Sequence, residues 1–242
     1  MQITGMLWGR KLLDLVEFPH SEVRGPELGV DDIKDMIKRH GQVFIKPLFK
    51  GGVGKKGKSG LLGRVDNITD ALKEKERLYF CEHVDGFSKV KSDGVTYEGA
   101  VPADYEVYFS ISESTEHRCP IMTVTHHGGV DIEELDEDKI KVVPFDALTG
   151  LKAFHVSNAL MELGAPPQVI SPLVQNLPKL WDLYNNYGML MLELNPIRMQ
   201  PGKGGRLAPI ACDFKCAFDQ DDPAWKRLHL PSHLFASDYS EF

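Results

Sequence analysis

The 242-residue sequence has no long apolar run and no excess of basic residues, and each lack excludes a class of protein. No stretch reaches the 18 or more apolar residues of a membrane span, and the first six residues lack the charged and apolar parts of a secretory signal. Asp and Glu number 35 against 28 Lys and Arg, so the net charge of -7 argues against a general nucleic-acid binder. We therefore expect a cytoplasmic protein that binds neither membranes nor nucleic acid.

Cysteine is also scarce. The four residues, Cys81, Cys119, Cys212 and Cys216, are too few for a disulfide framework in a chain of this length. Cys212 and Cys216 are separated by three residues, and no second Cys or His pair at zinc-ligand spacing lies near them. We expect reduced thiols that fill space on a strand.

The composition is typical of a globular protein, with 42% hydrophobic and 26% charged residues. Apolar spacing predicts helices over residues 9–18, from 31 onwards, and over 69–77, 157–163 and 171–187. We expect Pro178 to kink or split the last of these helices. β-prone runs cover residues 43–45, 61–65, 78–84, 106–112, 121–124, 189–194 and 207–218, and a polar loop is expected between 84 and 106. This pattern predicts an α+β fold with two lobes, residues 1–115 and 116–242.

A glycine-lysine loop follows the first of these strands. Residues 52–59, Gly-Val-Gly-Lys-Lys-Gly-Lys-Ser, match the P-loop pattern G-x-x-x-x-G-K-[ST]. A P-loop needs a helix that begins at its Lys-Ser, but residues 60–65 favour a strand. The alternatives are a basic surface loop and a flap between two strands, whose N–H groups and lysines close over the phosphates of a nucleotide. We favour the flap.

A late hairpin carries oxygen ligands. Alternation along the first strand places Glu193 and Asn195 on one face, and the returning strand can bring Asp213 opposite them. Magnesium prefers such hard oxygen ligands and usually takes one or two carboxylates, with water and phosphate completing its shell. The alternative is that Asp213 pairs with Lys215 or caps a turn.

Taken in order, these residues resemble the ATP-grasp domain of the succinyl-CoA synthetase β-subunit and of ATP-citrate lyase. The motifs are Lys46-Pro47, Lys56-Gly57-Lys58-Ser59-Gly60-Leu61-Leu62-Gly63, Glu82, Glu106-Val107-Tyr108, Gly128-Gly129-Val130-Asp131, Glu193-Leu194-Asn195-Pro196-Ile197 and Asp213. The likeness runs from about residue 9 to about residue 230. It implies an ATP-grasp fold in which the two lobes hold the nucleotide between them.

The resemblance also implies roles for single residues. Lys46 would contact the ATP phosphates, and Lys56, Gly57 and Lys58 would cover them, with Lys46 and Lys58 acting in catalysis. Glu82 would begin the hinge that holds the adenine, near the backbone of Val84. Glu106 would accept hydrogen bonds from the ribose hydroxyls. Asn195 and Asp213, together with Glu193, would hold Mg²⁺.

Several positions depart from the family. Lys56 stands where the relatives commonly have Arg, and Lys lacks the bidentate fork of Arg. His127 replaces the usual Glu before Gly-Gly-Val, and both the flap and the loop between Glu82 and Glu106 are longer than expected. His126 and His127 are expected to be ordinary strand-end histidines, because the phosphorylated histidine of the family belongs to a partner subunit or domain.

The CoA-ligase domain that follows in the relatives is expected to be absent here, which would leave CoA to a separate subunit or a missing domain. The resemblance therefore implies an ATP-dependent, ADP-forming ligase module that activates a small carboxylic acid through an acyl phosphate or a partner's phosphohistidine. Two alternatives stay open: a stand-alone carboxylate-amine ligase and a non-catalytic nucleotide-binding module. The acid is not identified by the sequence, because Arg198 and Arg206 are equally plausible as solvated hairpin charges. The choice between ATP and GTP is open as well.

Overall fold

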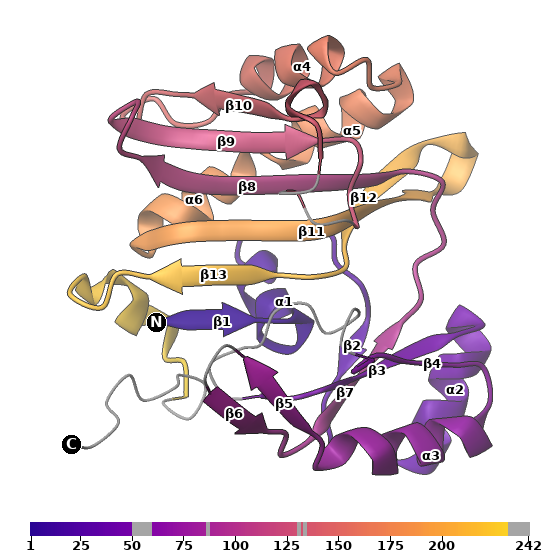
Figure 1. Cartoon of the computed structure of the whole chain (residues 1–242). Helices are drawn as coiled ribbons and strands as arrows, with labels where there is room; N and C mark the ends of the chain where they lie inside the picture. The colour runs from indigo at the N-terminus through magenta and orange to yellow at the C-terminus, as the bar shows by residue number, and fades with distance from the viewer. Residues whose placement is uncertain (50–59, 86–87, 130–131, 133–134, 232–242) are drawn as a thin grey trace.

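The computed structural model describes residues 1–49, 60–85, 88–129, 132 and 135–231, and these residues form two lobes (Figure 1). The mixture of helices and antiparallel strands confirms the predicted α+β class. Within the described residues, no helix is long and apolar enough to cross a membrane.

The larger lobe is built on one antiparallel sheet in the order β1-β13-β11-β8-β9-β10, and β12 also pairs with β11. Its strands are β1 (Gln2–Thr4), β8 (Glu106–Ser114), β9 (Cys119–Thr125), β10 (Lys141–Pro144), β11 (Met189–Pro201), β12 (Leu207–Ala211) and β13 (Lys215–Phe218). The helices of this lobe are α1 (Met6–Asp14), α4 (Ala153–Glu162), α5 (Pro167–Asn176) and α6 (Lys179–Asn186), with short 3₁₀ turns η2 (Glu137–Lys139), η3 (Lys203–Gly205) and η4 (Pro223–Leu228). Apolar residues of the helices and strands share one core, to which β11 contributes Leu192, Leu194 and Ile197.

The smaller lobe has its own sheet and core. Strands β2 (Val23–Arg24), β7 (Val95–Gly99), β3 (Val43–Pro47) and β4 (Gly63–Val65) pair in that order, and α2 (Val30–His40) and α3 (Ile68–Tyr79) pack against them. A separate two-stranded sheet is formed by β5 (Glu82–Asp85) and β6 (Ser88–Lys91). Local signals fix the helix ends: the side chain of Asn67 accepts a hydrogen bond from the N–H of Asp70, and Gly41 ends α2 with a φ of 73°.

The chain passes between the lobes twice. The first connector is held by backbone hydrogen bonds from Ser21 to Ala211 (2.9 Å) and from Ala211 to Pro19 (2.9 Å). The second connector leaves β7 after Gly99 and reaches β8 at Glu106. The larger core therefore takes residues from both sides of the expected boundary at 115, since β1, α1 and β8 all belong to it. As a division into domains, 1–115 and 116–242 stays a prediction.

Several predicted elements need correction. The region between residues 84 and 106 is not a polar loop, because it contains β6 and β7, and β7 is a buried strand of the smaller sheet. Its β-prone run Val95-Thr96-Tyr97 is short and lies between two glycines, which hides it from a search for longer runs. The expected strand 78–84 begins late, since Leu78 and Tyr79 still belong to α3. The run 207–218 is two strands, β12 and β13, and the predicted break at Pro178 is confirmed by the boundary between α5 and α6.

Candidate functional site

Lys46 and Glu98 form a buried ion pair on the sheet of the smaller lobe. Lys46 lies on β3 and Glu98 on the neighbouring β7, and the Lys46 Nζ is 2.6 Å from the Glu98 Oε2. The two side chains are only 19% and 6% exposed. Charges with so little contact with water are stable only when they are paired, so each of these groups depends on the other.

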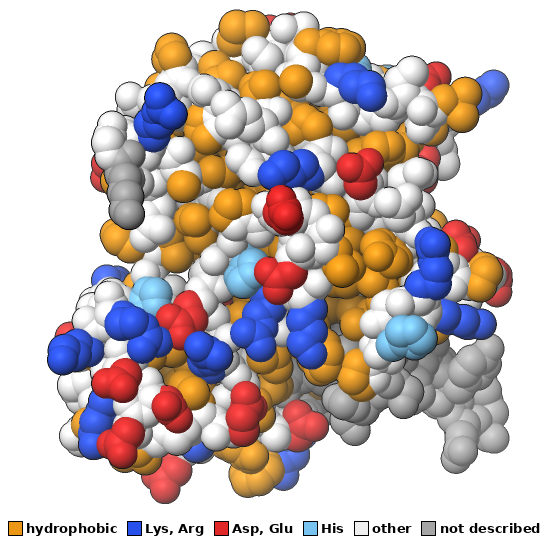
Figure 2. Space-filling view, turned by 180° about the vertical axis from the view of Figure 1, so that it is seen from behind, with side chains coloured by type: hydrophobic (Ala, Val, Ile, Leu, Met, Phe, Trp, Pro, Cys, Tyr) orange, Lys and Arg blue, Asp and Glu red, His pale blue; other side chains and the backbone are white. Residues whose placement is uncertain are grey.

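A second carboxylate, from the other lobe, also acts on Lys46. Burial by itself would lower the pKa of Lys46, but the attraction of Glu98 and of Asp213 outweighs burial and raises that pKa. Asp213 belongs to the larger lobe, where it follows β12. The structure therefore brings Lys46 and Asp213 to the same place between the lobes. Figure 2 shows from behind how the outline narrows where the lobes meet.

Asp213 lies in the break between β12 and β13, and not on one continuous returning strand as expected. Both strands pair with β11 in one common register: Ile197 lies opposite Ala211, and Glu193 lies opposite Lys215. That register places Asp213 opposite Asn195, at the point where the ladder is interrupted. The Asp213 Oδ1 accepts a hydrogen bond from the N–H of Phe214 (3.0 Å).

Glu193 and Asn195 complete a group of oxygen atoms with Asp213. Burial raises the pKa of Glu193, and the nearby charge of Asp213 raises it further, while Lys215 and the hydroxyl of Tyr108 act in the opposite direction. Two carboxylates that repel each other beside an amide oxygen are a donor set that suits Mg²⁺, because a cation between them would remove the repulsion. No group of three or more His, Cys, Asp or Glu suited to a metal occurs among the described residues. The group formed by Glu193, Asp213 and Asn195 has two carboxylates and one amide.

The Asn195 side chain has a further contact. Its Oδ1 accepts a hydrogen bond from the N–H of Gly129 (2.9 Å), which fixes the loop after β9 against β11. Gly129 has a φ of 74°, and a Cβ there would collide with the carboxylate of Glu106. Glycine is therefore favoured at position 129 by its positive φ, and at position 128 because a Cβ would stand 2.6 Å from the backbone of Val107.

Glu106 is held at the start of β8, where the second connector enters the larger sheet. Its Oε1 lies 2.6 Å from Nη2 of Arg198, and its backbone carbonyl accepts a hydrogen bond from the N–H of Gly128 (2.8 Å). Glu106 is thus in contact with β11 and with the Gly-Gly loop. It belongs to the same part of the larger lobe as Asn195.

The residues predicted for the adenine hinge lie on a separate sheet. Glu82 and Val84 are on the two-stranded sheet, where Glu82 pairs with Lys89 (2.5 Å) and Val84 is 64% exposed. The flap residues Lys56, Gly57 and Lys58 lie outside the described residues. The segment that follows the flap forms strand β4 and not a helix, which agrees with the rejection of a P-loop.

The histidines and cysteines match simple roles. The rings of His126 and His127 meet edge to face with centroids 4.3 Å apart, and burial lowers the pKa of His126, with a smaller contribution from His127. All four cysteines are free. Burial raises the pKa of Cys212 to about 12, so this thiol beside Lys46 is protonated at neutral pH.

Two residues of the site were missed in the sequence. Glu98 was assigned to a loop, although the β-prone run Val95 to Tyr97 could have indicated a strand next to it. Arg198 was grouped with Arg206 as an exposed charge, although alternation along β11 does not place it in a turn. In both cases the missing information was a tertiary partner: Lys46 for Glu98 and Glu106 for Arg198.

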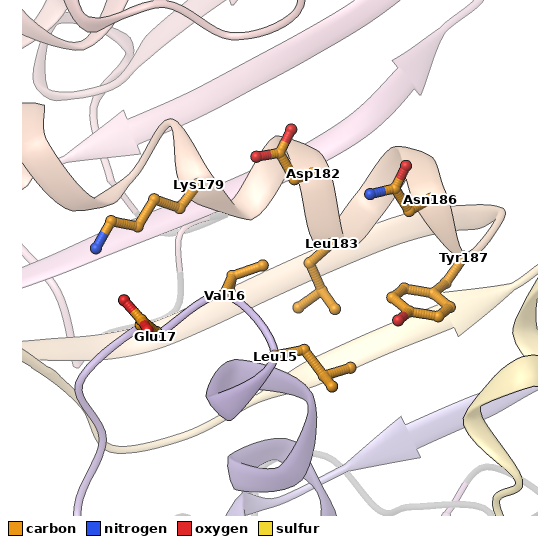
Figure 3. Close-up of a pocket in the computed structure, with 8 residues that line it drawn as sticks. All are labelled: Leu15, Val16, Glu17, Lys179, Asp182, Leu183, Asn186 and Tyr187. Carbon is orange, nitrogen blue, oxygen red and sulfur yellow. The ribbon is translucent and has the colours of Figure 1, made fainter.

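A shallow pocket of about 330 Å³ lies elsewhere, between the end of α1 and α6 (Figure 3). Its lining includes Leu15, Leu183 and Tyr187 and contains no residue of the group around Lys46 and Asp213. The pocket is an open depression on the larger lobe, lined by residues 15–17, which follow α1, and by residues of α6 with Tyr187 after it.

Comparison with known proteins agrees with the ATP-grasp resemblance of the sequence. The chain is 28% identical over 200 residues to the β-subunit of an ADP-forming succinate–CoA ligase of Desulfatibacillum aliphaticivorans, a match that covers 80% of this chain and 51% of that protein. The ATP citrate lyase structure from Methanothrix soehngenii, with citrate and coenzyme A, superimposes with a TM-score of 0.68 at 19% identity, covering 100% of this chain and 57% of that one. A dinucleotide-forming acetyl-coenzyme A synthetase of Ca. Korarchaeum cryptofilum, whose structure includes a phosphorylated phosphohistidine segment, gives a TM-score of 0.64 at 13% identity, covering 90% and 94%.

The chain spans about half the length of the curated relatives it matches. The structural matches establish an ATP-grasp fold, as the motif order predicted. The ATP-grasp domain model matches residues 19–199, which include the smaller lobe, part of the larger lobe, Lys46, Glu98 and Asn195, but not Asp213. The chain belongs to the ATP-grasp family.

Proposed function

We propose that this chain binds Mg-ATP between its lobes and transfers the γ-phosphoryl group toward a carboxylate, as the ATP-grasp part of an ADP-forming acyl-CoA ligase or an ATP-citrate lyase-like enzyme. The observation that carries the proposal is the approach of Lys46 and Asp213 from opposite lobes. A triphosphate with its cation needs a positive and a negative side chain on opposite sides, and Lys46 and Asp213 would supply them from the two lobes.

The residues have separate tasks. Lys46 neutralises phosphate charge, and Lys56, Gly57 and Lys58 of the flap cover the phosphates, with Lys58 acting beside Lys46. Asn195, Asp213 and Glu193 would hold Mg²⁺, which supplies charge neutralisation on the transferred group. Because phosphoryl transfer leaves little covalent work to the protein, alignment and neutralisation of charge supply most of the rate.

The nucleoside end has two candidate positions. The resemblance assigns the adenine hinge to Glu82 and Val84, and the ribose to Glu106. The connector from Glu98 to Val101 is a second candidate for the hinge, because it leaves the strand that holds Lys46 in place and runs to the lobe that carries Asp213. Val84→Pro would remove a backbone N–H donor from the hinge near Glu82 and would leave the connector from Glu98 to Val101 intact.

The acceptor is a small carboxylic acid or a phosphohistidine of a partner. The similarity to β-subunits of CoA ligases and the phosphohistidine segment of the Korarchaeum enzyme support a CoA-ligase partner, through which CoA would enter. A carboxylate-amine ligase is the second candidate, since an amine could attack an acyl phosphate within these two lobes. A non-catalytic nucleotide-binding module is the third.

ADP release separates these candidates. The purified chain, alone and with any co-purified partner, is incubated with Mg-ATP and a panel of carboxylic acids, with CoA or amines added in turn. The ligase proposal predicts acid-dependent ADP release that requires CoA, and the second candidate predicts release that requires an amine. Nucleotide binding without turnover in any combination would leave the non-catalytic module.

One variant ties turnover to the proposed site. Asp213→Asn removes a charge that faces both Glu193 and Lys46, and we expect it to lower kcat by about 10²-fold or more. Asp221→Asn makes the same chemical change at an exposed residue after β13 and serves as the control. Equal activity of the two variants would remove Asp213 from the mechanism.

A further inference from the structure

Arg198 joins the second connector to the proposed ribose site. It lies on β11, next to the strand that begins with Glu106, and the register pairs the two residues directly. Its Nη1 donates to the backbone carbonyl of Val101 (3.0 Å), and its Nη2 lies 2.6 Å from the Glu106 Oε1. One guanidinium therefore contacts both the connector between the lobes and the carboxylate at its end.

Neither water nor another side chain easily replaces Arg198 in these two contacts. The Arg198 and Glu106 side chains are 30% and 29% exposed, so water screens their attraction only in part. Val101 is 5% exposed, and its carbonyl would lose a partly buried hydrogen bond without Arg198. Lysine could keep the attraction to Glu106, but a single ammonium cannot reproduce the planar fork that reaches both groups.

Arg198 contacts one of the two carboxylate oxygens of Glu106, the Oε1. The Oε2 lies beside Gly129, and a Cβ on Gly129 would collide with this oxygen. A carboxylate held in this way through one oxygen can accept a hydrogen bond from a ligand hydroxyl through the other.

We propose that Arg198 is a positioning residue, which orients Glu106 to accept a hydrogen bond from the ribose of the nucleotide and fixes the connector beside it. The inference rests on the proposed function, because it requires a nucleotide between the lobes. It separates Arg198 from Arg206, which is exposed at the turn of the same hairpin. Arg206 accordingly has no part in nucleotide recognition.

The test compares ATP with 2′,3′-dideoxy-ATP, which lacks both ribose hydroxyls. Dissociation constants for the two Mg-nucleotides are measured by calorimetry for the wild-type chain, Arg198→Met, Arg198→Lys, Glu106→Gln and Arg198→Met/Glu106→Gln. The wild-type chain should bind ATP about tenfold more tightly than the dideoxy analogue, as expected for a hydrogen bond to a charged group. Arg198→Met should reduce this ratio toward that of Glu106→Gln, and the double variant should reduce it no further.

Arg206→Met is the matched control and should keep the wild-type ratio. An unchanged ratio in Arg198→Met would overturn the inference while the proposed function stands, since a merely structural role would weaken both nucleotides alike. Arg198→Lys, which retains the charge, covers the case in which Arg198→Met does not fold. A wild-type chain that binds neither nucleotide would overturn the proposed function and the inference together.

Discussion

The Lys46–Glu98 pair allows a prediction about stability and ligand binding in one experiment. Lys46→Met would remove the ammonium 2.6 Å from the Glu98 carboxylate, which is only 6% exposed. Glu98→Gln would leave the Lys46 ammonium with Asp213 as its remaining negative neighbour. Breaking a buried pair by removing one partner costs about 3–5 kcal/mol, because the other charge stays buried.

The free energy of unfolding is therefore expected to fall by about 3–5 kcal/mol in Lys46→Met. In a chain of this size, that is a decrease in the melting temperature of roughly 6–20 °C. The double variant Lys46→Met/Glu98→Gln removes both charges, so its loss should be smaller than the sum of the two single losses. Lys73→Met is the control, since Lys73 is 72% exposed in its pair with Asp70 and should change stability by less than about 1 kcal/mol.

The same variants are then measured with Mg-ATP. A ligand at 100 times its dissociation constant stabilises the wild-type chain by about 2.7 kcal/mol. Lys46→Met should lose most of this gain, because the phosphates lose their positive neighbour. Glu98→Gln should keep the gain or increase it, because the bound phosphates replace the missing negative charge beside Lys46.

Urea unfolding with and without nucleotide gives both quantities from one set of curves. An equal nucleotide-dependent gain in Lys46→Met and wild type would show that the phosphates lie away from Lys46 and would refute the reasoning. Additive losses in the two single variants would show that Lys46 and Glu98 do not depend on each other.

Two further predictions concern stability alone. Burial raises the pKa of Glu22, but hydrogen bonds from His40 and Arg39 outweigh burial and lower it from 4.5 to about 2, so the carboxylate stabilises the fold above pH 4.5 and loses that effect as pH falls toward 2. Glu22→Gln should therefore lower the free energy of unfolding at pH 7, by about 1 kcal/mol because Arg24 and Arg39 are half-exposed and water screens both pairs, and the loss should shrink as the pH falls toward 3; a loss independent of pH would contradict the assignment. Tyr184→Phe removes a hydroxyl that lies 3.1 Å from a Glu113 oxygen and should cost about 1 kcal/mol without changing nucleotide affinity, which thermal unfolding and calorimetry would check.

Local sequence patterns predicted the parts of the fold that depend on local physics. The split at Pro178 follows from the missing N–H of proline, and α2 and α3 follow from apolar spacing and acidic first turns. The order of motifs predicted the ATP-grasp fold, which the comparisons confirm. Lys46 and Asp213, singled out from opposite ends of the sequence, lie near each other in space.

The sequence did not reveal contacts that depend on pairing over long separations. Glu98 meets Lys46 only because β3 and β7 are adjacent in the sheet, although some 50 residues separate them in the chain. Arg198 meets Glu106 because β8 and β11 pair, and no local pattern indicates which of two hairpin arginines has a carboxylate beside it. The break between β12 and β13 is equally hidden, since Ile210 to Cys216 reads as one β-prone run.

The proposed site has a consequence for motion between the lobes. Lys46 keeps Glu98 as a partner within its own lobe, so its charge stays paired even when the lobes move apart. Asp213 and Glu193, in contrast, repel each other within the larger lobe, and Lys46 approaches Asp213 only when the lobes are close. The phosphates would place negative charge beside Lys46, and the cation would place positive charge beside Asp213 and Glu193. Nucleotide binding should therefore favour the closed arrangement of the lobes.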